Sequence, residues 1–127
     1  MRRPRPALPW SAGRARRRAR YSAWMGSAAW LEHRRAWAER HLEAHGAGPV
    51  CQVCGAPWSL RHGDLHHRSY ARLAHEADAD LVPLCRSCHG QLHRVLESST
   101  GWLRLGREAA TDQVVARLRA KRRVRSA

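Results

Sequence analysis

The chain has 127 residues and a formal net charge of +14, with 24 lysine and arginine residues against 10 acidic ones. A chain of this length suits one domain with extended ends and is too short for two independent cores. It contains no phenylalanine, so its apolar core is expected to be thin. Small domains with thin cores commonly need a staple such as a bound metal.

The positive charge is carried almost wholly by arginine. Lys121 is the only lysine, and the other 23 basic residues are arginine. Arginine forms bidentate contacts with phosphate more readily than lysine does, and a strongly basic chain attracts polyanions. We therefore expect a nucleic-acid partner, either DNA or RNA. The alternative is a highly charged surface that serves only solubility.

No segment predicts a membrane partner. No apolar run approaches the roughly 20 residues of a transmembrane helix, and the basic N-terminus lacks the apolar stretch of a secretory signal. These features favour the cytoplasm of a bacterium, for a bacterial or phage-encoded protein. In that reducing compartment paired cysteines hold metal more often than they form disulfides.

Residues 1–20 are predicted to form a disordered basic arm, because Pro4, Pro6 and Pro9 oppose helix formation. Closely spaced like charges also repel each other unless a polyanion neutralises them. Five arginines fall within seven residues of this segment, Arg14, Arg16, Arg17, Arg18 and Arg20. We interpret it as an arm that lies along phosphates, with a solvated tail as the alternative.

Residues 21–49 are predicted to contain one helix, capped by Ser27 and ending near His45 before Gly46. Its apolar face is expected to include Trp30, Leu31, Ala38 and Leu42, with Trp37 at the margin. His41 and His45 are four residues apart, but they lack the pattern of a metalloprotease motif. We interpret them as part of an ordinary helix face.

Residues 50–97 are expected to form the core, with short strands at Asp64–Tyr70 and Leu81–Leu84, a loop over 71–80 and a helix over Arg86–Glu97. Residues 98–127 are predicted to be a linker, Ser98–Gly106, and a last helix capped by Thr111. That helix ends in a basic run, Lys121, Arg122, Arg123 and Arg125. The expected fold class is therefore α+β.

Two Cys-x-x-Cys pairs predict a structural zinc site, and they consist of Cys51, Cys54, Cys85 and Cys88. Two-residue spacing allows both thiolates of a pair to point at one ion, and two pairs complete the tetrahedral coordination that structural zinc prefers. A redox role is the alternative, but it would explain only one pair.

Four histidines lie between and just after these pairs. His89 and His93 are four residues apart on the expected helix and share one face. His66 and His67 are adjacent on the expected strand, so their side chains point to opposite sides. One of the two can bind a metal while the other is free to act as a base, which metal-assisted phosphodiester hydrolysis requires.

The ordered motifs resemble the HNH, or ββα-metal, nuclease family in its zinc-bearing branch. The likeness covers residues 51 to 93. The matching runs are Cys51-x-x-Cys54, Leu65-His66-His67-Arg68-Ser69-Tyr70 and Asp80-Leu81-Val82-Pro83-Leu84-Cys85-x-x-Cys88-His89-x-x-x-His93. The resemblance implies a ββα-metal core and an endonuclease that leaves 5′-phosphate ends.

The resemblance also implies a role for each matching residue. His67 corresponds to the general base, and His66 and His89 correspond to metal ligands. His93 either completes the metal shell or contacts the scissile phosphate. Asp80 replaces the central asparagine, which in the family ties down the loop and helps to orient the base.

Other residues near the expected site allow several interpretations. Arg68 and Arg94 are expected to hold phosphates or else to form generic basic surface. Asp64, two residues earlier on the same strand face, is an alternative metal ligand to His66. His66 could also be a packing residue, and His89 could replace a cysteine in the zinc shell. Glu76 falls in the loop, and no chemistry is assigned to it.

The sequence thus predicts an endonuclease that nicks or cuts DNA and uses one divalent ion, which could be Mg²⁺, Mn²⁺, Ni²⁺ or Zn²⁺. A non-catalytic zinc-ribbon protein that binds DNA or RNA is the second hypothesis. An accessory subunit of a phage packaging or mobile-element machine is a third.

Overall fold

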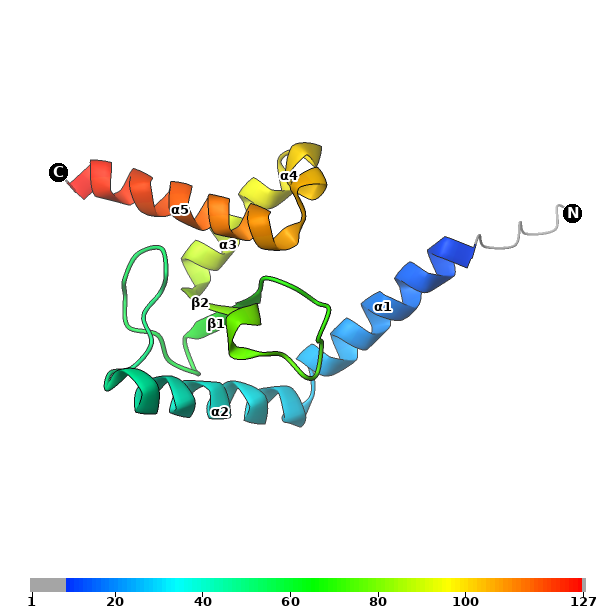
Figure 1. The fold of residues 1–127 in the computed structure, drawn as a ribbon, viewed down its shortest axis with the longest axis horizontal. Coiled ribbons are helices and arrows are strands. Elements are labelled where there is room, and N and C mark those ends of the chain that lie inside the picture. Colours follow the sequence, from blue (N-terminus) through cyan, green and yellow to red (C-terminus); the bar gives the residue numbers. More distant parts are fainter. Residues whose placement is uncertain (1–8, 127) are drawn as a thin grey trace, which may run out of the picture.

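The computed structural model describes residues 9–126, and it describes side chains for residues 13–125. Its regular elements are α1 (Pro9–Met25), α2 (Ala28–His45), β1 (Gly63–His67), the short 3-10 helix η1 (Asp78–Asp80), β2 (Leu81–Cys85), α3 (Arg86–Glu97), α4 (Thr100–Leu105) and α5 (Arg107–Ser126). Figure 1 shows the small sheet between α2 on one side and α3 with α5 on the other. The α+β class is confirmed.

Helix α1 corrects the prediction of a disordered arm. The chain is helical from Pro9 onward, whereas residues 1–8 lie outside the described residues. Proline is tolerated in a first helical turn because its missing N–H has no partner there, and arginine and alanine are strong helix formers. The helix extends away from the body, and only its C-terminal end approaches the other elements (Figure 1).

Helix α2 begins and ends as predicted. The Ser27 hydroxyl accepts a hydrogen bond from the Trp30 backbone N–H, and Gly46 ends the helix in the left-handed conformation. The buried face differs from the expected one, because Trp30 and Trp37 are buried while Leu31 and Leu42 are 57% and 53% exposed. The two indoles are seven residues apart and therefore share one face, which sets the side that packs inward.

Strands β1 and β2 pair in antiparallel register, with Leu65 opposite Pro83 and His67 opposite Leu81. Strand β1 ends at His67, three residues earlier than predicted, because the chain beyond it turns into the loop over 68–80. In a two-stranded sheet both strands are edges, so Pro83 is accommodated in β2. Such a sheet is marginal alone and needs packing on its faces.

The two faces of the sheet pack into two separate apolar clusters. Trp30, Trp37, Trp58, Leu65 and Leu81 form the cluster on the α2 side. The other cluster joins the first cysteine pair to β2, α3 and α5, and its buried members are Cys51, Val53, Leu84, Cys88, Leu92, Val114 and Val115. The side chain of each β1 residue therefore enters one of two different environments.

The C-terminal segment differs from its prediction in two respects. The expected linker contains α4, whose first turn is capped by the Ser99 hydroxyl, and α5 begins at Arg107. Gly106, at φ 87°, separates the two helices. Thr111 therefore does not cap a helix but lies within α5, where it is fully buried. Among the described residues, no helix is long and apolar enough to cross a membrane.

Gly63 is a strict packing constraint at the start of β1. A Cβ atom added there would lie 2.2 Å from Nε1 of Trp58, and that indole donates a 2.8 Å hydrogen bond to the Asp64 carbonyl. We expect Gly63→Ala to lower the free energy of unfolding by at least about 2 kcal/mol, as overpacking does, in urea denaturation of the zinc-loaded protein.

Gly48 provides the matched control for this substitution. It has no atom within 4 Å of an added Cβ, so Gly48→Ala should change stability by less than about 1 kcal/mol. Equal midpoints for the two variants would contradict the packing argument.

Candidate functional site

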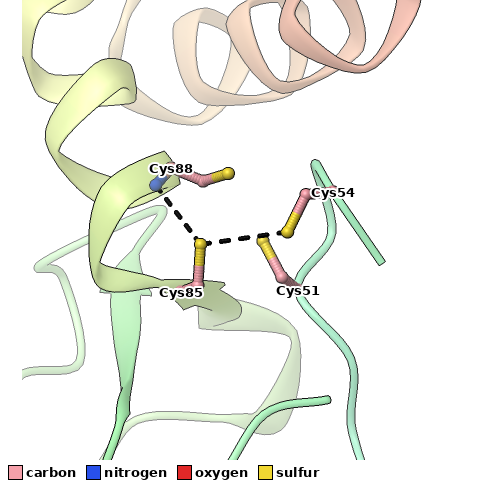
Figure 2. A group of neighbouring side chains, drawn as sticks. All are labelled: Cys51, Cys54, Cys85 and Cys88. Carbon is pink, nitrogen blue, oxygen red and sulfur yellow. Dashed lines mark hydrogen bonds between the residues drawn. The ribbon is translucent and has the colours of Figure 1, made fainter. Parts of the chain in front are cut away.

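Three segments bring the four cysteines together. Cys51 and Cys54 lie in the turn before β1, Cys85 ends β2, and Cys88 lies in the first turn of α3. The four sulfur atoms lie within 4.8 Å of one another. Figure 2 shows their side chains converging on one space between the turn and the start of α3.

The sulfur geometry fits a tetrahedral zinc site. A zinc–sulfur bond of about 2.3 Å places tetrahedral sulfurs about 3.8 Å apart, and the sulfurs of Cys54 and Cys85 are separated by 3.9 Å. All four cysteines are free, and a disulfide would need a separation of about 2.05 Å. The cluster can therefore bind a structural zinc ion.

Backbone N–H groups support thiolates in this cluster. The Cys88 N–H donates to Cys85 Sγ at 3.4 Å. Burial alone would raise the pKa of the Cys51 thiol, but N–H groups of Cys54, Cys85 and Val53 outweigh it and lower that pKa to about 7. Burial raises the pKa of the Cys88 thiol, so a metal ion that binds there would have to displace the thiol proton.

A second group that could hold a metal ion consists of His66, His89 and His93. Its ring nitrogens lie within 4.8 Å of one another. His66 Nδ1 is 3.3 Å from His89 Nε2, and His93 Nε2 is 2.9 Å from the same atom. Strand β1 supplies the first residue and one face of α3 supplies the other two, as predicted from their spacing.

The outer nitrogens of these three rings have polar neighbours. His66 Nε2 lies 3.0 Å from Thr111 Oγ1, His89 Nδ1 lies 3.0 Å from Asp64 Oδ2, and His93 Nδ1 lies 3.9 Å from Glu97 Oε1. Metal-ligating histidines commonly donate their second N–H in this way, which sets the tautomer and directs the other lone pair at the ion. The pattern fits a metal site better than a packed cluster.

Burial favours the neutral imidazole of His66 and of His93, which is the form that binds metal. Burial, followed by the nearby Arg107 charge, lowers the pKa of His66 to about 2. Burial and then His89 lower the pKa of His93.

This geometry bears on two of the open interpretations. Asp64 is not in the three-histidine group, which contains His66; the Asp64 carboxylate contacts His89 from outside that group. His89 belongs to the histidine group rather than to the cysteine cluster.

His67 points to the opposite face of β1, toward α2. Its ring stacks on Trp30 at a centroid distance of 5.1 Å, and Tyr70 lies 5.3 Å away. His67 Nε2 is 2.9 Å from Glu76 Oε2, and both side chains are buried. The expected opposite orientation of the two adjacent histidines is found.

The expectation that His67 is free to act as a base does not fit this arrangement. The residue is 3% exposed, and burial lowers its pKa while the hydrogen bond to Glu76 opposes that shift. Because Glu76 takes Nε2, Nδ1 is the nitrogen that remains to accept a proton. Glu76 also accepts a 3.0 Å hydrogen bond from Trp24 Nε1 of α1.

Asp80 is buried and organises the loop over 68–80. Its carboxylate pairs with Arg72 and accepts the Ala77 backbone N–H at 2.9 Å, while its carbonyl accepts the Arg68 N–H at 2.7 Å. The Arg72 guanidinium holds the pKa of Asp80 below its usual range. Among the described residues no hydrogen bond joins Asp80 to His67.

The predicted phosphate-binding arginines differ in their environments. Arg68 makes two hydrogen bonds to Asp112 and one to the Ala79 carbonyl, so its guanidinium is held by the fold rather than reserved for phosphate. Arg94 is exposed on α3, and the five arginines of residues 14–20 are exposed on α1.

Sequence reasoning missed three residues of this region, Thr111, Glu76 and Arg107. Arg107 donates from Nε to the His67 carbonyl at 2.7 Å, and its guanidinium lies 4.2 Å above the Tyr70 ring. All three approach β1 from other elements, and only the acidic character of Glu76 gave any sequence signal.

No protein-family model matches the chain, and no curated protein or solved structure is similar enough to match it.

The cysteine cluster predicts one tightly held zinc ion per chain. We expect Cys88→Ser to lose that zinc and most helical structure, because the free energy of metal binding becomes free energy of folding. Elemental analysis and circular dichroism measure the two effects. His89→Ala should keep the zinc, and full zinc content in Cys88→Ser would contradict the assignment.

The Thr111 contact predicts an effect on the histidine group alone. Thr111→Val has nearly the same shape but cannot accept from His66 Nε2, and we expect it to weaken Ni²⁺ or Mn²⁺ binding at this group by about tenfold. Calorimetric titration of zinc-loaded protein measures this affinity. Thr111→Ser, which keeps the hydroxyl, should bind the metal ion like the wild type. An unchanged metal affinity in Thr111→Val would show that the contact between Thr111 and His66 does not support metal binding.

Proposed function

We propose that the protein is a metal-dependent endonuclease of the HNH type that hydrolyses DNA phosphodiester bonds. The observation that carries this proposal is the group of His66, His89 and His93, whose outer nitrogens are engaged so that their inner nitrogens face one another. This group occurs in a chain of net charge +14, which would attract a polyanionic substrate.

The three histidines would hold one divalent ion, and Thr111 and Asp64 would orient the rings of His66 and His89. When bound, such an ion supplies Lewis-acid stabilisation of the charge that develops on the phosphate and the leaving oxygen. Imidazole ligands suit Ni²⁺ and Zn²⁺ better than Mg²⁺.

His67 is the candidate proton acceptor. The buried Glu76 carboxylate holds the proton on Nε2 and leaves Nδ1 to take a proton from the attacking water. Because His67 is 3% exposed, this role requires a covering side chain to move when nucleic acid binds. Tyr21 of α1 is one such neighbour, with its ring 6.2 Å from that of His67.

The resemblance to the HNH family supports the proposal at a further position. Asp80 occupies the place of the family's central asparagine, for which the resemblance implies a loop-tying role. In this chain Asp80 binds Arg72 and the Ala77 N–H across the loop over 68–80. Elements β1, β2 and α3 also follow one another in the order that the family motif requires.

The burial of His67 favours a second candidate, a zinc-stabilised protein that binds nucleic acid without cutting it. A histidine stacked on Trp30 and bonded to Glu76 can serve packing alone. The accessory-subunit hypothesis has no specific observation in its favour and stays a prediction.

Plasmid nicking with added Mn²⁺, Ni²⁺ or Mg²⁺ separates the two candidates. We expect His89→Ala to abolish nicking, since it removes a ligand, while zinc content and DNA affinity stay near those of the wild type. His67→Ala should reduce nicking by about 100-fold or more, the size of a general-base contribution. It should still bind the divalent ion at the three-histidine group.

Each failure of the nicking experiment has a distinct meaning. If His67→Ala nicked plasmid as fast as the wild type, His67 would not be the proton acceptor. Absence of nicking by the wild type with every metal, together with intact DNA binding, would favour the non-cutting protein.

A further inference from the structure

A pocket lies between α1 and the loop that follows β1. Its volume is about 380 Å³, and it is lined by Arg17, Arg18, Arg20 and Tyr21 of α1 and by Tyr70, Ala71 and Leu73 of the loop. Concave sites of roughly 300–1,000 Å³ are the size that proteins use for small organic groups. Neither the proposed metal ligands nor the zinc cluster contributes to its lining.

The lining combines two kinds of surface. The rings of Tyr21 and Tyr70 meet edge to face at 5.2 Å, and Ala71 and Leu73 add apolar contact. Arginines supply all the charge, and the lining contains no acidic residue. Within residues 13–125, whose side chains the structure describes, Arg17, Arg18 and Arg20 make no hydrogen bond or ion pair.

Such a lining suits an occupant that joins a flat apolar group to negative charge. Phosphate alone would use the arginines but not the aromatic surface. A nucleotide would use both, because its base stacks on aromatic rings and its phosphates pair with guanidinium groups. A base within a duplex cannot enter, since its faces are covered by its neighbours, so the base must be unpaired.

The two tyrosines of the pocket lie next to His67, the candidate proton acceptor. Tyr70 lies 5.3 Å and Tyr21 lies 6.2 Å from the ring of His67. Arg107 lies over the Tyr70 ring and donates to the His67 carbonyl, which holds Tyr70 in place. A nucleotide in the pocket would therefore lie beside the candidate base.

We propose that this pocket binds one unpaired nucleotide of a nucleic-acid strand. The inference rests on the proposed function for its nucleic-acid partner and adds the form of the substrate: single-stranded DNA, or a site where a base leaves the duplex. An intact duplex can still bind the exposed arginines of α1, but it leaves the pocket unused.

The test compares affinities for a fluorescent single-stranded oligonucleotide and for the matching duplex, without added Mn²⁺, Ni²⁺ or Mg²⁺, so that cleavage plays no part. Tyr21→Leu keeps apolar bulk but removes the flat ring. We expect it to weaken single-strand binding by about tenfold, the effect of losing one stacked base, and to change duplex binding by less than about twofold. Tyr21→Phe, which keeps the ring, should match the wild type.

A second pair of variants avoids any effect on the packing of α1. Ala71 is exposed, so Ala71→Glu places a negative charge at the pocket without disturbing the core, and Ala71→Gln is the neutral control of similar size. Ala71→Glu should weaken single-strand binding more than duplex binding, whereas Ala71→Gln should weaken neither.

Three results would overturn the inference: equal losses for single strand and duplex, no loss in Tyr21→Leu and Ala71→Glu, or a free nucleoside monophosphate that binds as tightly as the strand. If the protein nicks plasmid but gives any of these results, the proposed function stands and only the nucleotide pocket is contradicted. If it never nicks plasmid but binds single strands through Tyr21, the pocket stands and the nuclease function is contradicted.

Discussion

The alternation of side chains along β1 is the constraint on which the rest of the structure depends. Adjacent residues of a strand face opposite sides, so His66 enters the histidine group with α3 and α5 while His67 enters the aromatic cluster with α2. A two-stranded sheet has little stability of its own, and each face is covered by different helices. A shift of one residue in register would exchange the two histidines.

The cysteine cluster and the histidine group share the short segment formed by β2 and α3. Cys85 and Cys88 are anchored where the strand becomes the helix, and His89 directly follows on α3. A zinc ion held there would secure the first turn of α3 and so the direction in which His89 and His93 point. Such an ion would stabilise the small core and also position the neighbouring histidine group.

Short-range patterns predicted the parts of the fold that depend on local chemistry. The spacing of the cysteines and of the histidines predicted which of them lie together. Capping and periodicity predicted the Ser27 cap of α2 and the bounds of α3. The partners Thr111 and Arg107 could not be predicted, because they reach β1 from 45 and 40 residues away. The prolines and the repulsion between arginines indicate disorder in the sequence, but the helix propensity of arginine and alanine prevails from Pro9 onward.

The contact between Thr111 and His66 also has a consequence for biosynthesis. Chains emerge from the ribosome with their N-terminal part first, and Thr111 follows His66 by 45 residues. All three histidines are therefore synthesised before the helix that supports His66. The nascent chain would therefore lack the ordered histidine group while it is still close to ribosomal RNA, and the group would mature only after α5 has folded back.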